Sequence, residues 1–226
     1  MAQPSAQPSL DLGALFQKSW TVFQRNALVF VLGLIVVCVI LAVAGFIASL
    51  IGGRFAGIGV ALVQGPLALG YFGVALSAAR GGTPQFPAIF EGFNRYLPAF
   101  LASLAISAPN LVGTLAGGGL IGVVMALVSL VFAFVFCLTY FYMGDKKLDF
   151  WPSMQSSQRT VTNAIGPWIV LYLVLIVVNA VAALPCGLGL LITVPMSAVI
   201  LALAYDQVEG RPTFSGEREP ESDYQA

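Results

Sequence analysis

The sequence contains no histidine and only three cysteines, and charged residues make up 9% of its 226 residues. Histidine is the commonest general base and a frequent metal ligand, so its absence weakens any prediction of acid–base or metal chemistry. Cys38, Cys137 and Cys186 are scattered and odd in number, so they indicate neither a disulfide framework nor a metal site. We therefore expect no catalytic residue, no metal and no cofactor.

Acidic and basic residues are equally scarce, with ten of each, so the net charge predicts no nucleic-acid partner. Apolar residues are abundant instead, since 58% of the chain is hydrophobic and the mean hydropathy is +0.91. An ordinary soluble domain carries roughly a quarter charged residues to cover its surface. The outside of this protein must therefore face lipid, and membrane lipids are its predicted partners.

Six apolar runs are each long enough to cross a hydrocarbon core, which requires roughly 20 helical residues. They cover residues 27–51, 55–79, 97–115, 120–143, 166–184 and 188–205. Glycine- or proline-containing turns join the two runs of each pair, and the last turn, Pro185-Cys186-Gly187, predicts a tight antiparallel hairpin. The predicted fold is all-α, a polytopic transmembrane bundle of three helical hairpins.

Two segments that precede hairpins repeat apolar residues at helical spacing. They are Leu12, Phe16, Trp20 and Phe23, and Phe86, Phe90, Phe93 and Leu97. This pattern is typical of amphipathic helices in the membrane interface, although the polar ends of longer spans would produce it too. Residues 1–9 and 215–226 are polar and predict disordered tails, which leaves residues 10–214 as the transmembrane domain.

Basic residues fall almost entirely on one side of the predicted membrane. Nine lie in or beside the connections on that side, namely Lys18, Arg25, Arg80, Arg95, Lys146, Lys147, Arg159, Arg211 and Arg218. Only Arg54 lies on the other side. Because short loops rich in Lys and Arg stay in the cytoplasm, we expect both termini to be cytoplasmic.

The first and last hairpins share an order of features that indicates an internal repeat. Leu10-Asp11 precedes Leu148-Asp149 by 138 residues. The series Gly57-x-Gly59, Pro66 and Gly82-x-Pro84-x-Phe86 is echoed by Gly187-x-Gly189, Pro195 and Gly210-x-Pro212-x-Phe214. The middle hairpin fits more weakly. The simplest architecture is three parallel repeats, whereas inverted repeats are common in alternating-access carriers.

Six residues within or near the spans are candidate sites because they are polar or break a helix. They are Gln64, Pro66, Pro109, Asn110, Asn179 and Pro195. A transporter could use freed carbonyls and amides to coordinate a solute, but the same residues commonly serve as kinks and interhelical hydrogen bonds. The spans contain no ionisable residue well inside them, which weakens the prediction of an ion-coupled carrier.

Two acidic residues, Asp145 and Asp206, lie at the ends of the fourth and sixth spans. Paired aspartates in membrane proteins can cleave peptide bonds, so an intramembrane enzyme predicts that these carboxylates approach each other. The motif is incomplete, because Tyr142-Met143-Gly144-Asp145 lacks a first glycine and Lys146 and Lys147 follow at once.

The chain resembles an uncharacterised family of bacterial six-helix membrane proteins, related to the membrane domain fused to some glycerophosphodiester phosphodiesterases. The matching motifs are Ser19-Trp20-x-x-Phe23-x-x-Asn26, Gly65-Pro66-Leu67, Phe90-x-Gly92-Phe93-x-x-Tyr96 and Pro185-Cys186-Gly187-x-Gly189. The resemblance implies a multi-pass protein of the bacterial inner membrane, without the soluble phosphodiesterase domain.

Three functions are therefore open at the level of sequence. We expect first a non-enzymatic protein that acts through lipid or protein contacts, as a scaffold or accessory subunit, with a membrane-protein partner or a second copy of itself. A small-solute permease or channel is the alternative, and it predicts an aqueous cavity lined by Gln64, Asn110 and Asn179. An intramembrane enzyme that uses Asp145 and Asp206 comes third.

Overall fold

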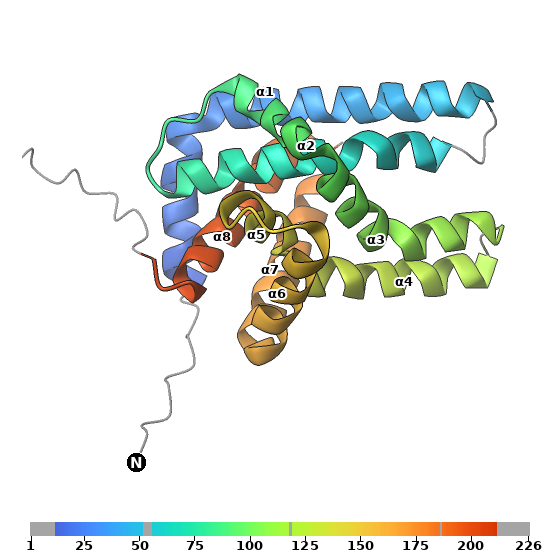
Figure 1. Ribbon diagram of the computed structural model, residues 1–226. Coiled ribbons are helices and arrows are strands. Elements are labelled where there is room, and N and C mark those ends of the chain that lie inside the picture. Colours follow the sequence, from blue (N-terminus) through green and yellow to red (C-terminus); the bar gives the residue numbers. More distant parts are fainter. Residues whose placement is uncertain (1–11, 52–55, 118, 186, 212–226) are drawn as a thin grey trace, which may run out of the picture.

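The computed structural model describes residues 12–51, 56–117, 119–185 and 187–211, and these residues form an all-α protein (Figure 1). The expected terminal tails lie outside the described residues. The helices are α1 (Leu12–Ile51), α2 (Ala56–Ala79), the 3₁₀ helix η2 (Phe86–Arg95), α3 (Tyr96–Leu115), α4 (Gly119–Val135), α5 (Thr139–Asp145), α6 (Phe150–Asn163), α7 (Ile165–Ala183) and α8 (Leu190–Val208).

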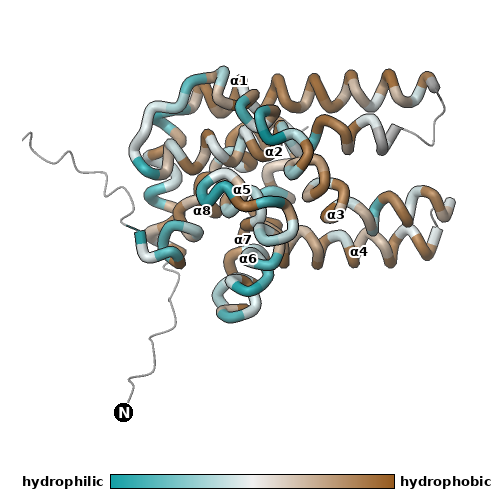
Figure 2. The backbone as a smooth tube through the Cα atoms, in the orientation of Figure 1, coloured by the Kyte–Doolittle hydropathy of each residue, from teal (hydrophilic) through white to brown (hydrophobic). Residues whose placement is uncertain are grey.

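Six of the helical stretches are long and apolar enough to cross a membrane, which confirms the predicted class of fold. They form three hairpins, made by α1 with α2, by α3 with α4 and α5, and by α7 with α8. Hydrophobic residues dominate the long helices α1, α3 and α4, whereas hydrophilic residues gather around α5, α6 and the connection after α2 (Figure 2). We call this second region the polar end.

Three junctions reveal the repeat more clearly than the sequence does. The backbone leaves helical geometry at Asn26 (φ −123°, ψ 19°), at Arg95 (φ −124°, ψ 47°) and at Ala164 (φ −133°, ψ 46°). The first two are 69 residues apart and so are the last two. Each junction separates an amphipathic segment from the span that follows it. The segments before the spans are therefore distinct helical pieces, and the middle hairpin belongs to the repeat.

Burial follows the same register in all three repeats. Four residues after each junction lies a fully buried side chain, Phe30 in the first repeat, Ala99 in the second and Trp168 in the third. Their volumes differ greatly although their positions correspond. Side chains of such different volume can occupy equivalent positions only when the side chains around them differ in size as well. The repeats therefore share a backbone arrangement, whereas their side-chain packing differs.

The repeats pack around one another in cyclic order. Helix η2 packs against α2, α6 packs against α5, and α1 packs against α8. Each repeat thus lays its first elements on the second arm of another hairpin. The second arms lie at the centre, since α2 contacts both α5 and α8, and α8 is buried continuously from Ala198 to Asp206.

The second arm of the middle hairpin is broken rather than continuous, because α4 ends at Val135 and α5 begins at Thr139. The predicted fourth span, residues 120–143, did not include this break, which no proline marks. Ser157 of α6 satisfies the freed backbone groups: its Oγ accepts the Leu138 N–H at 3.1 Å and donates to the Val135 carbonyl at 2.9 Å. A serine far along the chain thus stabilises the break.

Helices α2 and η2 approach so closely that only glycine fits at their contact. A Cβ at Gly70 would overlap the Ile89 carbonyl, and a Cβ at Gly92 would overlap the Pro66 carbonyl. These obstacles are backbone atoms, which cannot move aside as a flexible side chain can. The two glycines therefore allow the interfacial segment of the second repeat to lie directly on α2.

This contact predicts that Gly70→Ala and Gly92→Ala each destabilise the protein by about 1–3 kcal/mol, the usual cost of overpacking. Gly73→Ala is the matched control on the same helix, because a Cβ there meets no atom within 4 Å. Thermal unfolding of the purified protein in detergent measures the difference. Equal melting temperatures for Gly70→Ala and Gly73→Ala would contradict the close contact.

Candidate functional site

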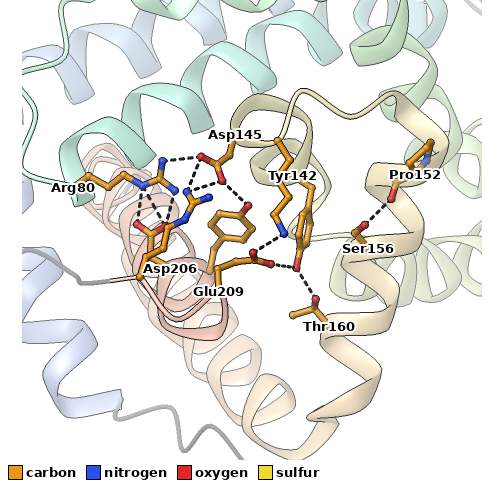
Figure 3. A network of polar contacts seen from close by, with 11 residues as sticks. Arg80, Tyr142, Asp145, Pro152, Ser156, Thr160, Asp206 and Glu209 are labelled. Carbon is orange, nitrogen blue, oxygen red and sulfur yellow. Dashed lines mark hydrogen bonds and ion pairs between the residues drawn. The ribbon is translucent and has the colours of Figure 1, made fainter.

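The second arms of the three hairpins bring their charged ends together at the polar end. Arg80 directly follows α2, Asp145 ends α5, and Asp206 lies near the end of α8. Figure 3 shows Arg80 reaching toward both carboxylates. Each repeat therefore contributes one charged residue to a single cluster, which we call the arginine cluster.

Arg80 uses its whole guanidinium group to bind the two aspartates. Its Nε lies 3.2 and 3.0 Å from the carboxylate oxygens of Asp206, and its second amino nitrogen lies 2.6 Å from Oδ1 of that residue. The remaining amino nitrogen donates to Asp145 at 2.8 Å. This fork geometry is specific to arginine, since lysine cannot bind two carboxylates in one plane.

Burial makes this pairing obligatory. The Asp206 side chain is fully buried, that of Asp145 is 8% exposed and that of Arg80 is 32% exposed. An unpaired carboxylate at the position of Asp206 would be strongly disfavoured. The hydrogen bonds to Asp206, together with the bond to Asp145, raise the pKa of the Arg80 guanidinium above its ordinary value, although burial acts in the opposite direction.

Two further residues complete the coordination of Asp145. The Tyr205 hydroxyl donates to its Oδ2 at 2.9 Å, and Arg211 lies 2.8 and 2.7 Å from its two oxygens. The bond to Asp145 raises the pKa of Arg211 in turn. The carboxylate thus accepts hydrogen bonds from three side chains, all of which favour its ionised form.

A second set of contacts joins α6 to the same centre. The Tyr142 hydroxyl lies 2.7 Å from the Thr160 hydroxyl and donates to Glu209 at 2.9 Å (Figure 3). Lys146 forms an ion pair with Glu209 at 2.5 Å. The end of α8 is therefore bound directly to residues of and beside α5, and it is linked to α6 through Tyr142.

Asp145 and Asp206, the predicted aspartate pair, bind the same guanidinium. A catalytic aspartate pair, however, shares a proton between two carboxylates that repel each other. Here Arg80 lies between them and supplies a positive charge to each. The arrangement is suited to joining helices rather than to moving a proton.

The predicted amides do not come together. Gln64 on α2 and Asn110 on α3 are exposed, and Asn110 lines a shallow pocket with Gly113, Thr114 and Gly122. Asn179 on α7 is occupied, since its Nδ2 donates to Ser197 at 2.9 Å and its Oδ1 accepts from Thr193 at 2.9 Å. These two bonds tie α7 to α8.

The three prolines, Pro66, Pro109 and Pro195, are buried within α2, α3 and α8. The Pro66 carbonyl faces Gly92 of η2 in the close contact described above. The backbone that precedes Pro66 also takes part in packing, because Gly65 lies against the Ala99 carbonyl. Pro66 therefore lies in a helix crossing.

A pocket of about 760 Å³ adjoins the arginine cluster. Helix α2, η2 and the end of α5 form its walls. Apolar residues of α2 line part of it, and charged and amide side chains line it as well, namely Arg80, Glu91, Asn94, Arg95, Asp145 and Lys147. Sequence reasoning did not predict this pocket, because its residues come from segments as much as 78 positions apart.

Sequence reasoning also missed Arg80 and Arg211 as partners of the aspartates. The sequence indicates Arg80 only as a residue that ends a span and helps to set the orientation. The available signal was weak: each second arm ends beside a charge, but nothing in the spacing says that 65 and 126 residues separate direct partners.

The fold and the polar end define an all-α, multi-pass membrane protein whose hairpins are joined by an internal ionic cluster. Comparison with known proteins found no matching family model, no matching curated protein and no matching solved structure. Within the described residues, no group of three or more Cys, Asp or Glu side chains could hold a metal ion.

The arginine cluster predicts that Arg80→Ala destabilises the protein by about 3–5 kcal/mol, because it leaves Asp206 buried without a partner. This corresponds to a fall in melting temperature on the order of 10 °C. Arg80→Lys keeps the charge but loses the fork, so an intermediate fall is expected. The exposed Arg159 of α6 provides the control, Arg159→Ala. A fall no larger than that of the control would contradict the role of the cluster.

Proposed function

We propose that this chain is a non-enzymatic protein of the bacterial inner membrane, with both termini in the cytoplasm, that acts through lipid or protein contacts as a scaffold or accessory subunit. This proposal rests on the observation that the charged residues at the ends of the second arms are bound by neighbouring side chains. Arg80, Asp145 and Asp206 bind one another, and Glu209 is bound by Tyr142 and Lys146.

Lipid contacts are supported by the exposed aromatic residues of the amphipathic segments. Trp20 in the first segment is 45% exposed, Phe90 and Phe93 of η2 are each 38% exposed, and Trp151 of α6 is 58% exposed. Tryptophan and other amphipathic aromatic residues concentrate where a membrane meets water. Three such segments surround the polar end, which suits a protein that organises lipid at one face of the bilayer.

Protein contacts are supported by the open surface of α4. None of its residues is buried, and apolar side chains such as Leu120, Leu127 and Val131 are exposed along it. Lipid covers such a surface by default, and a second membrane protein can replace that lipid with little loss of apolar contact. This helix is where we expect a partner to bind.

The lipid part of the proposal predicts which tryptophans contact lipid. In three variants that each keep one tryptophan, brominated phospholipid should quench Trp20 and Trp151 strongly, because bromine quenches only nearby indoles. Trp168 is 1% exposed and serves as the internal control, with little quenching expected. Fluorescence of the variants in vesicles measures this, and equal quenching at all three positions would contradict interfacial lipid contact.

The proposal also predicts that the protein does not conduct small solutes. Vesicles that contain the protein should swell in glycerol, urea or an amino acid at the rate of protein-free vesicles, as followed by stopped-flow light scattering. Saturable, protein-dependent swelling would instead support the permease alternative. Asn179→Ala then provides a specific check, because a permease that used this amide would lose activity.

A further inference from the structure

We propose that the pocket beside the arginine cluster binds one membrane phospholipid, with its phosphate at the polar rim and an acyl chain along α2. This inference rests on the lipid part of the proposed function and names its ligand and site. The pocket, of about 760 Å³, is large enough for a headgroup and the first part of a chain.

One wall of the pocket runs along α2. Leu69, Phe72, Gly73 and Leu76 form its apolar part, since steps of three or four residues keep side chains on one side of a helix, and Arg80 lies one turn beyond Leu76. From Leu69 to Arg80 this face extends for about 16 Å, at a rise of 1.5 Å per residue. The pocket therefore leads from the charged end toward the depth of the hydrocarbon core.

Two glycines keep this face open. A Cβ added at Gly73 would meet no atom within 4 Å, and one added at Gly144 of α5 would meet only the tip of Leu69 at 3.7 Å. Gly73 differs in this respect from Gly70, one turn earlier, where η2 occupies the space. Close packing thus explains Gly70 but not Gly73, whose missing side chain leaves space for a ligand.

The rim carries two cations that keep hydrogen-bond donors for a ligand. Lys147 is exposed and makes no hydrogen bond or ion pair with any other described residue. Arg95 donates one amino group to the Met143 carbonyl at 2.7 Å, and its other lies 3.6 Å from the largely exposed Asp149. Both cations therefore keep donors for a phosphate group.

The negative charges at the rim differ in what they bind. Asp145 is already occupied by Arg80, Arg211 and Tyr205, so it does not repel a phosphate strongly. Glu91 is exposed and has no ion pair within the described chain. Glu91 suits the ammonium or hydroxyl groups that phospholipid headgroups carry beside the phosphate. A rim of both signs thus complements a headgroup better than it complements a simple anion.

Native mass spectrometry of the full chain in neutral detergent tests this proposal. Phosphatidylethanolamine and phosphatidylglycerol should bind at least tenfold more tightly than diacylglycerol with the same acyl chains. Lys147→Gln should weaken phospholipid binding about fivefold, the usual effect of one basic residue near a lipid headgroup. Arg159→Gln, a change of charge elsewhere at the polar end, should leave binding unchanged.

Gly73→Leu tests the apolar part of the pocket separately. A Cβ at Gly73 meets no atom within 4 Å, so the leucine enters open space. The variant should therefore keep its melting temperature and lose at least tenfold in phospholipid affinity. Unchanged binding in Gly73→Leu, or equal binding of diacylglycerol, would overturn the proposal. Displacement of the lipid by millimolar inorganic phosphate would also overturn it, because the ligand would then be a soluble anion.

This test and the swelling assay fail independently. If phospholipid and diacylglycerol bind equally, the proposed ligand of the pocket is ruled out, but the proposed non-conducting function is unaffected. Protein-dependent swelling would remove that function whatever the pocket binds.

Discussion

The structure depends on one guanidinium group. Arg80 follows the second arm of the first hairpin and binds Asp145 from the second hairpin and Asp206 from the third. Helices in a membrane gain little from hydrophobic association, because lipid is as apolar as their side chains. A buried, forked ion pair supplies the directional attraction that apolar packing lacks, and its loss leaves an uncompensated charge. The three hairpins, which also pack against one another, are thereby held in one arrangement at the polar end.

The repeat explains why a single arginine suffices. Asn26, Arg95 and Ala164 bend the chain in the same way at equal intervals, so the second arms converge on one centre. Once they converge, one charge from each arm is enough to join them. The amphipathic segments then lie around the cluster and expose aromatic residues, which the proposed function assigns to lipid contact. The same geometry thus produces both the internal ionic contact and the outer surface on which the proposed function depends.

The sequence predicts the spans well because each needs only a long uncharged run, which is a local and strong signal. It also indicates the repeat, through Gly-x-Gly and proline motifs. It does not predict the break after Val135, because the group that stabilises it, Ser157, lies on another helix. It identifies Asp145 and Asp206 as unusual without finding Arg80 between them. Partners across a bundle are chosen by packing, and packing leaves little trace in the spacing of residues along one chain.

The measurement that tests this account most directly is a double-mutant cycle between Arg80 and Asp206. The free energy of unfolding would be measured in mixed micelles for Arg80→Gln, Asp206→Asn and the double variant. If the guanidinium joins the hairpins, the double variant loses less stability than the two single variants lose together. The difference, which is the coupling free energy, should be at least about 1 kcal/mol. Losses that add to within about 0.3 kcal/mol would contradict the central role of this pair.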